Sequence, residues 1–308
     1  MKKLFLMALL SASVVGMMQS CGSDTPPGGG TAALTVSETQ RSLLIYNTAT
    51  WCGPCGAYGS PEYKGALSTR DVNSLVCIDL HSSGSSYLVP TFVKNDTLFI
   101  ANFVQSLYAQ TKPNGYIPHF YMSNSFLGNT GTTAATMTAF ADDYNKNTKP
   151  EVGVGANASM SGNKITVNYK MQAFNPEAGA KYYTSVVIVE KEIGCYQAGA
   201  SGTFATHKNI VRASAHKNSA GNQIAFSETA IMDNPAKGAI VEKSASFDYV
   251  ETPANLVTKI NSATQSASGF DFGWWKINKT NTGVAVIVWK YISPTEMFYV
   301  NTVWADVK

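Results

Sequence analysis

The 308-residue chain predicts an α/β domain followed by an all-β sandwich domain. Up to about residue 149, short apolar runs typical of buried strands alternate with segments whose apolar residues recur at helical spacing, which is typical of a layered α/β fold. After Pro150 this pattern gives way to strict alternation of apolar and polar residues. We therefore assign residues 38–149 to the first domain and 150–308 to the second.

The first 37 residues resemble the signal peptide and tether of a bacterial lipoprotein. Residues 1–20 have a basic start and an apolar run too short for a stable membrane span. Residues 18–21 (MQSC) resemble a lipobox, which would make Cys21 the lipidated first residue; the alternative is ordinary cleavage that leaves a free thiol. Residues 21–37, rich in Gly and Pro, would then be a flexible tether.

The residue after Cys21 is Gly22 and not aspartate. By the same resemblance, the anchor belongs in the outer membrane of a Gram-negative bacterium, on its periplasmic face or at the cell surface. Without residues 1–20 the chain has 21 basic and 20 acidic side chains, since Lys2 and Lys3 are removed. This balance gives no argument for a nucleic-acid partner, and we expect membrane contact only through the lipid.

The first domain is expected to alternate strands and helices. Strands are predicted at residues 43–46, 73–80 and 117–122, and helices at 56–67 with a bend near Pro61, at 96–111 with Asp96 as N-cap, and at 132–147 with a threonine N-cap. Residues 123–131 are polar and turn-like, so we expect the sheet to be trimmed there.

Residues 51–55 (WCGPC) follow the first predicted strand and lead into a helix. Two cysteines with this spacing form a redox pair or half of a metal site. Backbone N–H groups at the helix start stabilise a thiolate on Cys52, which lowers its pKa and makes it a nucleophile. Gly53 and Pro54 keep Cys52 and Cys55 close enough for a disulfide, so a redox pair is favoured.

The motif matches the active site of the thioredoxin-like superfamily, and this resemblance covers about residues 38–148. It implies that Cys52 attacks a substrate disulfide, that Cys55 resolves the intermediate, and that Trp51 shapes the surface beside the sulfur. Residues 56–61 and 207–212 resemble a narrower group, the outer-membrane lipoproteins related to a twenty-eight-kilodalton outer membrane protein. That group is known mainly as antigens and adhesins.

Ile117-Pro118 matches the position of the superfamily's cis-proline, whose backbone docks the substrate; the alternative is an ordinary loop proline. His119 follows the proline, and we hypothesise that its protonated form lowers the pKa of the Cys52 thiol. Tyr46 stands six residues before Cys52, where thioredoxin has a buried carboxylate that relays protons. This difference argues against a fast reductase cycle.

The second domain is expected to be a β-sandwich of about seven short strands. The candidates are residues 152–158, 165–171, 182–189, 208–215, 240–250, 283–289 and 297–305, with a hairpin turn at 161–163 and one helical connection at 254–263. His207 lacks a visible nucleophile partner and is expected to be a partly exposed strand histidine. Residues 270–275 (FDFGWW) are either an aromatic ligand platform or buried aromatics.

The two remaining cysteines, Cys77 and Cys195, are either bridged to each other or separate, and an apolar strand favours an inert, buried Cys77. No second CxxC or HxxxH pair accompanies residues 52–55, so no metal site is predicted. No cofactor is predicted either.

Two functions remain open. The first is an extracytoplasmic thiol–disulfide oxidoreductase, reductase- or isomerase-like, acting on protein thiols and disulfides, with the sandwich binding a partner or substrate. The second is an outer-membrane binding or adhesion lipoprotein whose thioredoxin-like domain is a scaffold with a static disulfide.

Overall fold

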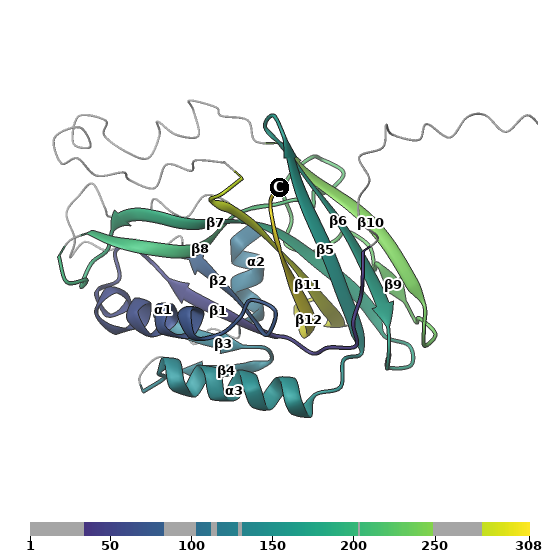
Figure 1. Ribbon diagram of the computed structural model, residues 1–308, viewed down its shortest axis with the longest axis horizontal. Coiled ribbons are helices and arrows are strands. Elements are labelled where there is room, and N and C mark those ends of the chain that lie inside the picture. Colours follow the sequence, from purple (N-terminus) through teal and green to yellow (C-terminus); the bar gives the residue numbers. More distant parts are fainter. Residues whose placement is uncertain (1–33, 83–102, 112–115, 129–130, 203, 249–278) are drawn as a thin grey trace, which may run out of the picture. The chain divides into compact units, whose positions relative to one another are not determined.

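The computed structural model describes residues 34–82, 103–111, 116–128, 131–202, 204–248 and 279–308 (Figure 1). These residues form mostly β-structure with a small helical part. The strands are β1 Ser42–Thr48, β2 Leu75–His81, β3 His119–Met122, β4 Ser125–Gly128, β5 Val152–Ser161, β6 Lys164–Ala173, β7 Lys181–Tyr196, β8 Phe204–Ser214, β9 Met232–Asp233, β10 Ile240–Asp248, β11 Thr282–Ser293 and β12 Glu296–Asp306. The helical elements are the π-helical turn η1 Cys55–Gly59 and the α-helices α1 Ser60–Thr69, α2 Phe103–Gln110 and α3 Ala134–Asn147.

The predicted alternation of strands and helices is present up to α3. β1 pairs in parallel with β2 and antiparallel with β3, and both of its faces are buried. Ile45 packs in the same cluster as Leu107 of α2, whereas Leu44 packs on the opposite face with Tyr63 of α1 and Met137 of α3. Burial on both faces explains why the strand reads as a continuous apolar run.

A short strand, β4, forms where a polar turn was expected, so the prediction of a trimmed sheet is wrong. It pairs antiparallel with β3, with Phe126 opposite Tyr121. Ser123 adopts a φ of 55°, which allows the chain to reverse within two residues. Two apolar residues within a polar segment are enough to continue the sheet.

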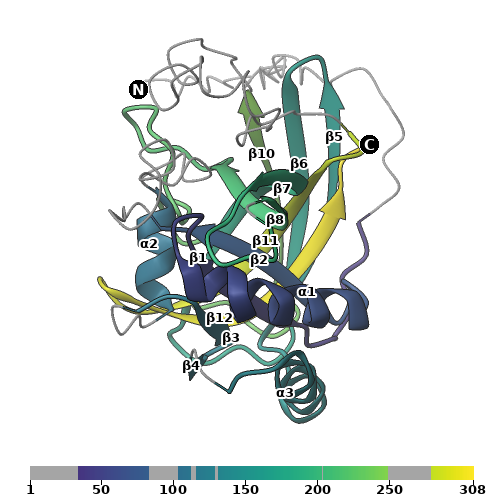
Figure 2. The ribbon, with the colours of Figure 1, turned by 90° about the vertical axis from the view of Figure 1, so that its left-hand side faces the viewer.

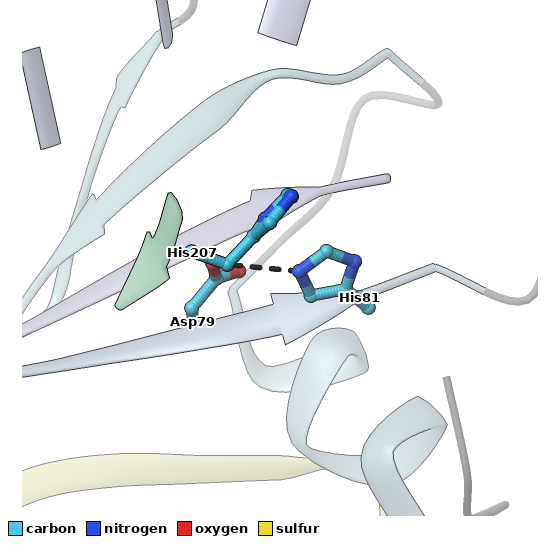
Figure 3. A group of neighbouring side chains, drawn as sticks. All are labelled: Asp79, His81 and His207. Atoms are coloured by element: carbon cyan, nitrogen blue, oxygen red, sulfur yellow. Dashed lines mark ion pairs between the residues drawn. The ribbon is translucent and has the colours of Figure 1, made fainter. Parts of the chain in front are cut away.

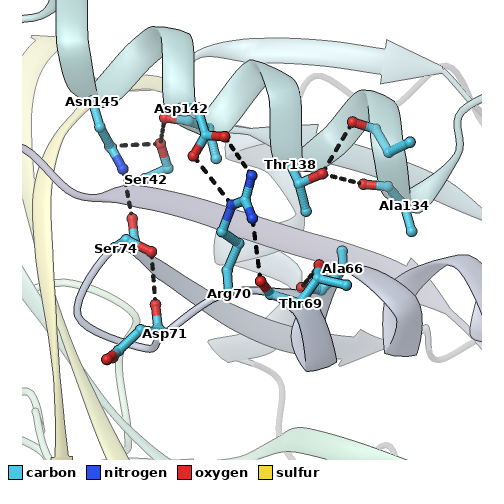
Figure 4. Close-up of polar contacts among 12 residues, drawn as sticks. Ser42, Ala66, Thr69, Arg70, Asp71, Ser74, Ala134, Thr138, Asp142 and Asn145 are labelled. Carbon is cyan, nitrogen blue, oxygen red and sulfur yellow. Dashed lines mark hydrogen bonds and ion pairs between the residues drawn. The ribbon is translucent and has the colours of Figure 1, made fainter.

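Polar side chains connect helix α3 to the end of α1 and to the sheet (Figure 4). Arg70, at the end of α1, forms a bidentate ion pair with Asp142 of α3. Asn145 Nδ2 donates to the Ser74 carbonyl at 2.8 Å, and its Oδ1 accepts from Ser42 Oγ at 2.8 Å. These contacts tie α3 to the beginnings of β1 and β2.

The large sheet contains strands from both sides of residue 150. Its order is β12-β11-β7-β8-β2-β1-β3-β4, with β9 paired to β7. β8 joins β2 in parallel through Asp79 and Ile210. The seven strands predicted after residue 150 are present, and the short β9 was not predicted.

A second sheet has the order β10-β6-β5, and Figure 2 shows these three strands grouped together. Its inward side chains share a hydrophobic cluster with β7, β11 and β12. Tyr169 of β6, Ile188 of β7 and Val286 of β11 are all buried in this cluster. Among the described helices, none is both long and apolar enough to cross a membrane. The helix predicted at 254–263 and the Asp96 N-cap lie outside the described residues.

Candidate active site

Cys52 and Cys55 form a disulfide between the end of β1 and η1. Their Cα atoms are 5.2 Å apart, and the chain is helical from Gly53 onward. The Cys55 N–H donates to Cys52 Sγ at 3.2 Å, so a helix-start N–H points at the sulfur that would carry the thiolate. Cys52 is 5% exposed and Cys55 is fully buried.

The Ile117–Pro118 peptide is cis, which confirms the prediction, and it faces the disulfide. The Ile117 carbonyl oxygen lies 3.6 Å from Cys52 Sγ. Trp51 and Ile117, both partly buried, pack against the two cysteines in one small cluster. Of the eight residues predicted for the site, 51–55 lead from β1 into η1 and 117–119 lead into β3.

Gly59, the last residue of η1, packs directly against Pro118. A Cβ at position 59 would lie 2.8 Å from Pro118 Cβ and 2.6 Å from the Tyr46 hydroxyl. Both contacts are shorter than any normal carbon contact, so only glycine fits here without a shift.

Tyr46 supports the backbone of Cys55. Its hydroxyl donates to the Cys55 carbonyl at 3.1 Å, and its ring is stacked between Tyr63 and Phe120 at centroid distances of 5.0 and 5.2 Å. Burial, with a smaller effect from Asp79, raises the pKa of Tyr46, so the phenol stays neutral. A neutral hydrogen-bond donor therefore stands six residues before Cys52.

A buried carboxylate is nevertheless close by in the sheet. Asp79 of β2 stands opposite Tyr46 in the strand register and is 2% exposed. Sequence analysis did not single out Asp79, because one acidic residue within the apolar run of residues 75–80 forms no recognisable motif.

His119 is buried on the α2 side of the sheet, where both ring nitrogens have partners. Nε2 lies 2.6 Å from Asn47 Nδ2 and 3.0 Å from Thr111 Oγ1, and Nδ1 lies 3.0 Å from the Tyr116 carbonyl. A carbonyl only accepts, so Nδ1 carries the proton, and Nε2 accepts from the Asn47 amide. Burial lowers the pKa of His119, which also favours the neutral ring.

We expect His119→Ala to leave the pKa of the reduced Cys52 thiol unchanged, because a neutral imidazole contributes no charge. The variant should lose about 1–3 kcal/mol of stability, since the Asn47 and Thr111 side chains lose a buried partner. Thiol titration by absorbance at 240 nm checks the first result and urea unfolding the second. A raised thiol pKa in the variant would show instead that His119 stabilises the thiolate by its charge.

A loop from the C-terminal half covers the CxxC turn. This covering loop, residues 197–202, connects β7 to β8. Gln197 Nε2 lies 2.9 Å from the Cys52 carbonyl and 3.1 Å from the Ala49 carbonyl, and the Ala198 N–H donates to the Thr50 carbonyl at 2.8 Å. No local sequence pattern indicates this contact, since the two segments are about 145 residues apart.

Gly199→Ala is expected to displace the covering loop, because the new Cβ would lie 2.0 Å from the Gly53 carbonyl oxygen. Gly202→Ala is a matched control: both glycines have positive φ, 76° and 85°, but nothing lies within 4 Å of a Cβ at 202. Both variants carry about 1–2 kcal/mol of left-handed backbone strain, and Gly199→Ala adds about 1–3 kcal/mol of overpacking.

The readout is the alkylation rate of Cys52 in the reduced protein, with urea unfolding alongside. We expect faster alkylation in Gly199→Ala only. Equal rates in the two variants would mean that the covering loop does not limit access to Cys52.

Cys77 and His207 are not among the residues that pack around the disulfide. In the part of the chain that the structure describes, Cys77 is free and buried, and burial raises the pKa of its thiol, as expected of an inert cysteine. It is therefore not bridged to Cys195. His207 is 3% exposed, so the prediction of a partly exposed histidine is wrong; the junction of β8 with β2 buries it. Cys21 and residues 270–275 lie outside the described residues.

The geometry defines a class of site, a CxxC disulfide at a strand-to-helix junction facing a cis-proline. No family model and no curated protein sequence matches the chain. Among solved structures, the fold is similar to HBP35 of Porphyromonas gingivalis, with a TM-score of 0.61 at 12% identity over 89% of this chain and 77% of that one. It is also similar to protein AGR_C_4864 from Agrobacterium tumefaciens, with a TM-score of 0.51 at 11% identity over 87% of this chain and 95% of that one.

A third match is a domain of the outer membrane lipoprotein Omp28 from Porphyromonas gingivalis, at a TM-score of 0.25 and 11% identity over 52% of this chain and 91% of that one. At these identities, the first two likenesses concern the fold alone.

Proposed function

We propose that the protein is a thiol–disulfide oxidoreductase of the thioredoxin-like class, exported and anchored through a lipid at Cys21 to the outer membrane. The observation that carries the proposal is the Cys52–Cys55 disulfide facing the cis Ile117–Pro118 peptide, with the Ile117 carbonyl oxygen 3.6 Å from Cys52 Sγ. A purely structural disulfide needs neither a helix start behind its first sulfur nor a docking peptide in front of it.

The reaction needs two exchange steps. In the reduced protein the Cys52 thiolate attacks one sulfur of a substrate disulfide, which forms a mixed disulfide and releases the other substrate sulfur as a thiolate that takes up a proton. Cys55, deprotonated, then attacks Cys52 Sγ and releases the second substrate thiolate. The substrate gains two electrons and the Cys52–Cys55 pair loses them, so each cycle requires an external dithiol as reductant.

The neighbouring residues have roles that follow from their positions. Trp51, Gly53 and Pro54 form the surface beside the sulfur, where Trp51 is half-buried and Pro54 exposed. The Ile117–Pro118 backbone offers an extended substrate segment hydrogen-bond partners next to the disulfide. The described strands after residue 150 would supply a binding surface for the substrate or a partner, and the covering loop contacts the CxxC turn from this part of the chain.

The test is the reduction potential of the Cys52–Cys55 pair, measured by dithiothreitol or glutathione titration with Trp51 fluorescence and Cys52→Ser as the control. A potential between about −270 mV, as for thioredoxin, and about −120 mV, as for a strong oxidant, supports the proposal and gives the direction of electron flow. A pair that stays oxidised below about −300 mV is a structural disulfide, which would overturn it.

One observation favours the second candidate, a binding lipoprotein with a static disulfide. Cys52 is only 5% exposed, and the covering loop lies over its turn. If the potential falls below about −300 mV, this function replaces the first.

A further inference from the structure

Three side chains with metal-ligating atoms meet where β2 joins β8 (Figure 3). Asp79 and His81 come from β2, and His207 comes from β8. One donor atom from each lies within 4.8 Å of the other two, and all three residues are buried, with exposures of 2–3%. We propose that Asp79, His81 and His207 bind one divalent transition-metal ion, with Zn²⁺ as the ion that best fits this ligand set.

The spacing suits a shared metal better than a direct hydrogen bond. His81 Nε2 lies 3.4 Å from Asp79 Oδ2, beyond the usual N–H···O range of about 2.7–3.2 Å. Two ligands bound to Zn²⁺ at about 2.0–2.1 Å with a tetrahedral angle are about 3.3–3.4 Å apart. The His207 ring lies 5.3 Å from the His81 ring between centroids, tilted by 59°, and one of its ring nitrogens lies within 4.8 Å of the ligand atoms of Asp79 and His81.

The ligand types select the class of ion. Two imidazoles and one carboxylate suit Zn²⁺ and its transition-metal neighbours. Ca²⁺ and Mg²⁺ prefer all-oxygen sites and fit poorly. Three protein ligands are the number found in zinc sites that keep one position for water or substrate.

The surroundings of Asp79 also favour a cation. Burial raises the pKa of Tyr46 and of Tyr63, and the charge of Asp79 raises each of them to a smaller extent. Both phenols are therefore neutral, whereas the half-buried Lys64 is a cation whose pKa Asp79 affects. A buried carboxylate is stable when it is paired or coordinates a metal, and a dication would bind the imidazoles of His81 and His207 together with it.

The position of the cluster explains why no sequence motif revealed it. Residues 79 and 81 lie on one face of β2 because strand side chains alternate, and His207 arrives through the β2–β8 pairing. A metal here would link β2 to β8, the strand from the C-terminal half that pairs with it. It would thus reinforce a junction whose backbone register consists of Asp79 and Ile210.

The test is Zn²⁺ binding by the full chain, stripped with a chelator and kept oxidised so that Cys52 and Cys55 offer no thiolate. Competition with a chromophoric chelator should give one Zn²⁺ per chain. Asp79→Asn, His81→Gln and His207→Gln should each weaken binding by more than the roughly 10–100-fold that loss of an outer-shell partner costs. His216→Gln, the same substitution at a histidine outside the cluster, should bind as the original does.

Absence of stoichiometric binding, or binding that survives all three ligand substitutions, would overturn the proposal. X-ray absorption at the zinc edge on the unmutated protein keeps the test independent of variants that fail to fold. A shell of nitrogen and oxygen at about 2.0–2.2 Å supports the site. Sulfur at about 2.3 Å would place the metal on a cysteine instead and overturn it. The outcome does not depend on the reduction potential of the disulfide.

Discussion

Replacing Cys52 by serine is expected to lower the rate of disulfide reduction by at least about 10³-fold, because the attacking thiolate is removed. A serine hydroxyl has no comparable anion at neutral pH, and the helix start that stabilises a thiolate cannot compensate. The assay is dithiothreitol-driven reduction of insulin, followed by turbidity. In the reduced protein, where the Cys52–Cys55 disulfide is open, stability should change far less than activity, because serine is close in size to the cysteine that it replaces.

Cys77→Ser is the matched control. Cys77 is a free, buried cysteine in β2 whose thiol pKa is raised by burial, so it takes no part in exchange at neutral pH. We expect its activity per folded molecule to equal that of the unmutated protein. Equal loss in Cys52→Ser and Cys77→Ser would mean that the assay reports unfolding and that Cys52 is not the nucleophile.

Cys55→Ser extends the same prediction to the second step. With the resolving thiol removed, the mixed disulfide on Cys52 should accumulate, and it can be trapped and identified by non-reducing electrophoresis and mass spectrometry. Cys55 is fully buried behind Cys52, which matches a thiol that reacts only within the protein. A substrate adduct on Cys55 instead of Cys52 would reverse the assigned order.

Local patterns predicted the elements of this fold well, because each element has its own signal. The capping box at Thr133 and Thr136, with a 3.2 Å hydrogen bond, starts α3 near the expected residue. Gly162, at a φ of 55°, reverses the chain between β5 and β6 as the hairpin pattern predicted. The error at β4 arose because two apolar residues, Phe126 and Leu127, are too few to show a period.

Pairings between distant segments could not be predicted in the same way. Asp79 and Ile210 meet across 131 residues, and neither strand sequence specifies its partner. For the same reason, the sequence does not predict that the covering loop contacts the CxxC turn or that Asp79, His81 and His207 lie together. The residues of the CxxC turn were found because their chemistry lies within five consecutive positions, whereas these sites exist only after the sheet has formed.

A buried ion pair joins β7 and β8 next to the point where β8 pairs with β2. Arg212 Nε of β8 lies 3.2 Å from Glu190 Oε2 of β7, and both side chains are almost fully buried. Glu190 stands opposite Ile210, which is also the residue that pairs with Asp79 of β2. The charge pair therefore lies where the C-terminal strands join the N-terminal ones.

Arg212→Met is expected to destabilise the protein by about 3–5 kcal/mol, because it leaves the Glu190 carboxylate buried without this partner's charge. The double variant Glu190→Leu with Arg212→Met should recover most of that loss, since two apolar side chains carry no desolvation penalty. The measurement is urea unfolding of the single and double variants, which gives their coupling energy.

Glu192 and Lys208 provide a control on the same two strands. They also form an ion pair across β7 and β8, but Glu192 is 57% exposed and Lys208 is 34% exposed. Lys208→Met should cost only about 0–1 kcal/mol, because water screens the pair and solvates the remaining carboxylate. If Arg212→Met lowered the free energy of unfolding no more than Lys208→Met, the prediction would be wrong. The buried pair of Glu190 and Arg212 would then contribute no more to stability than the exposed pair.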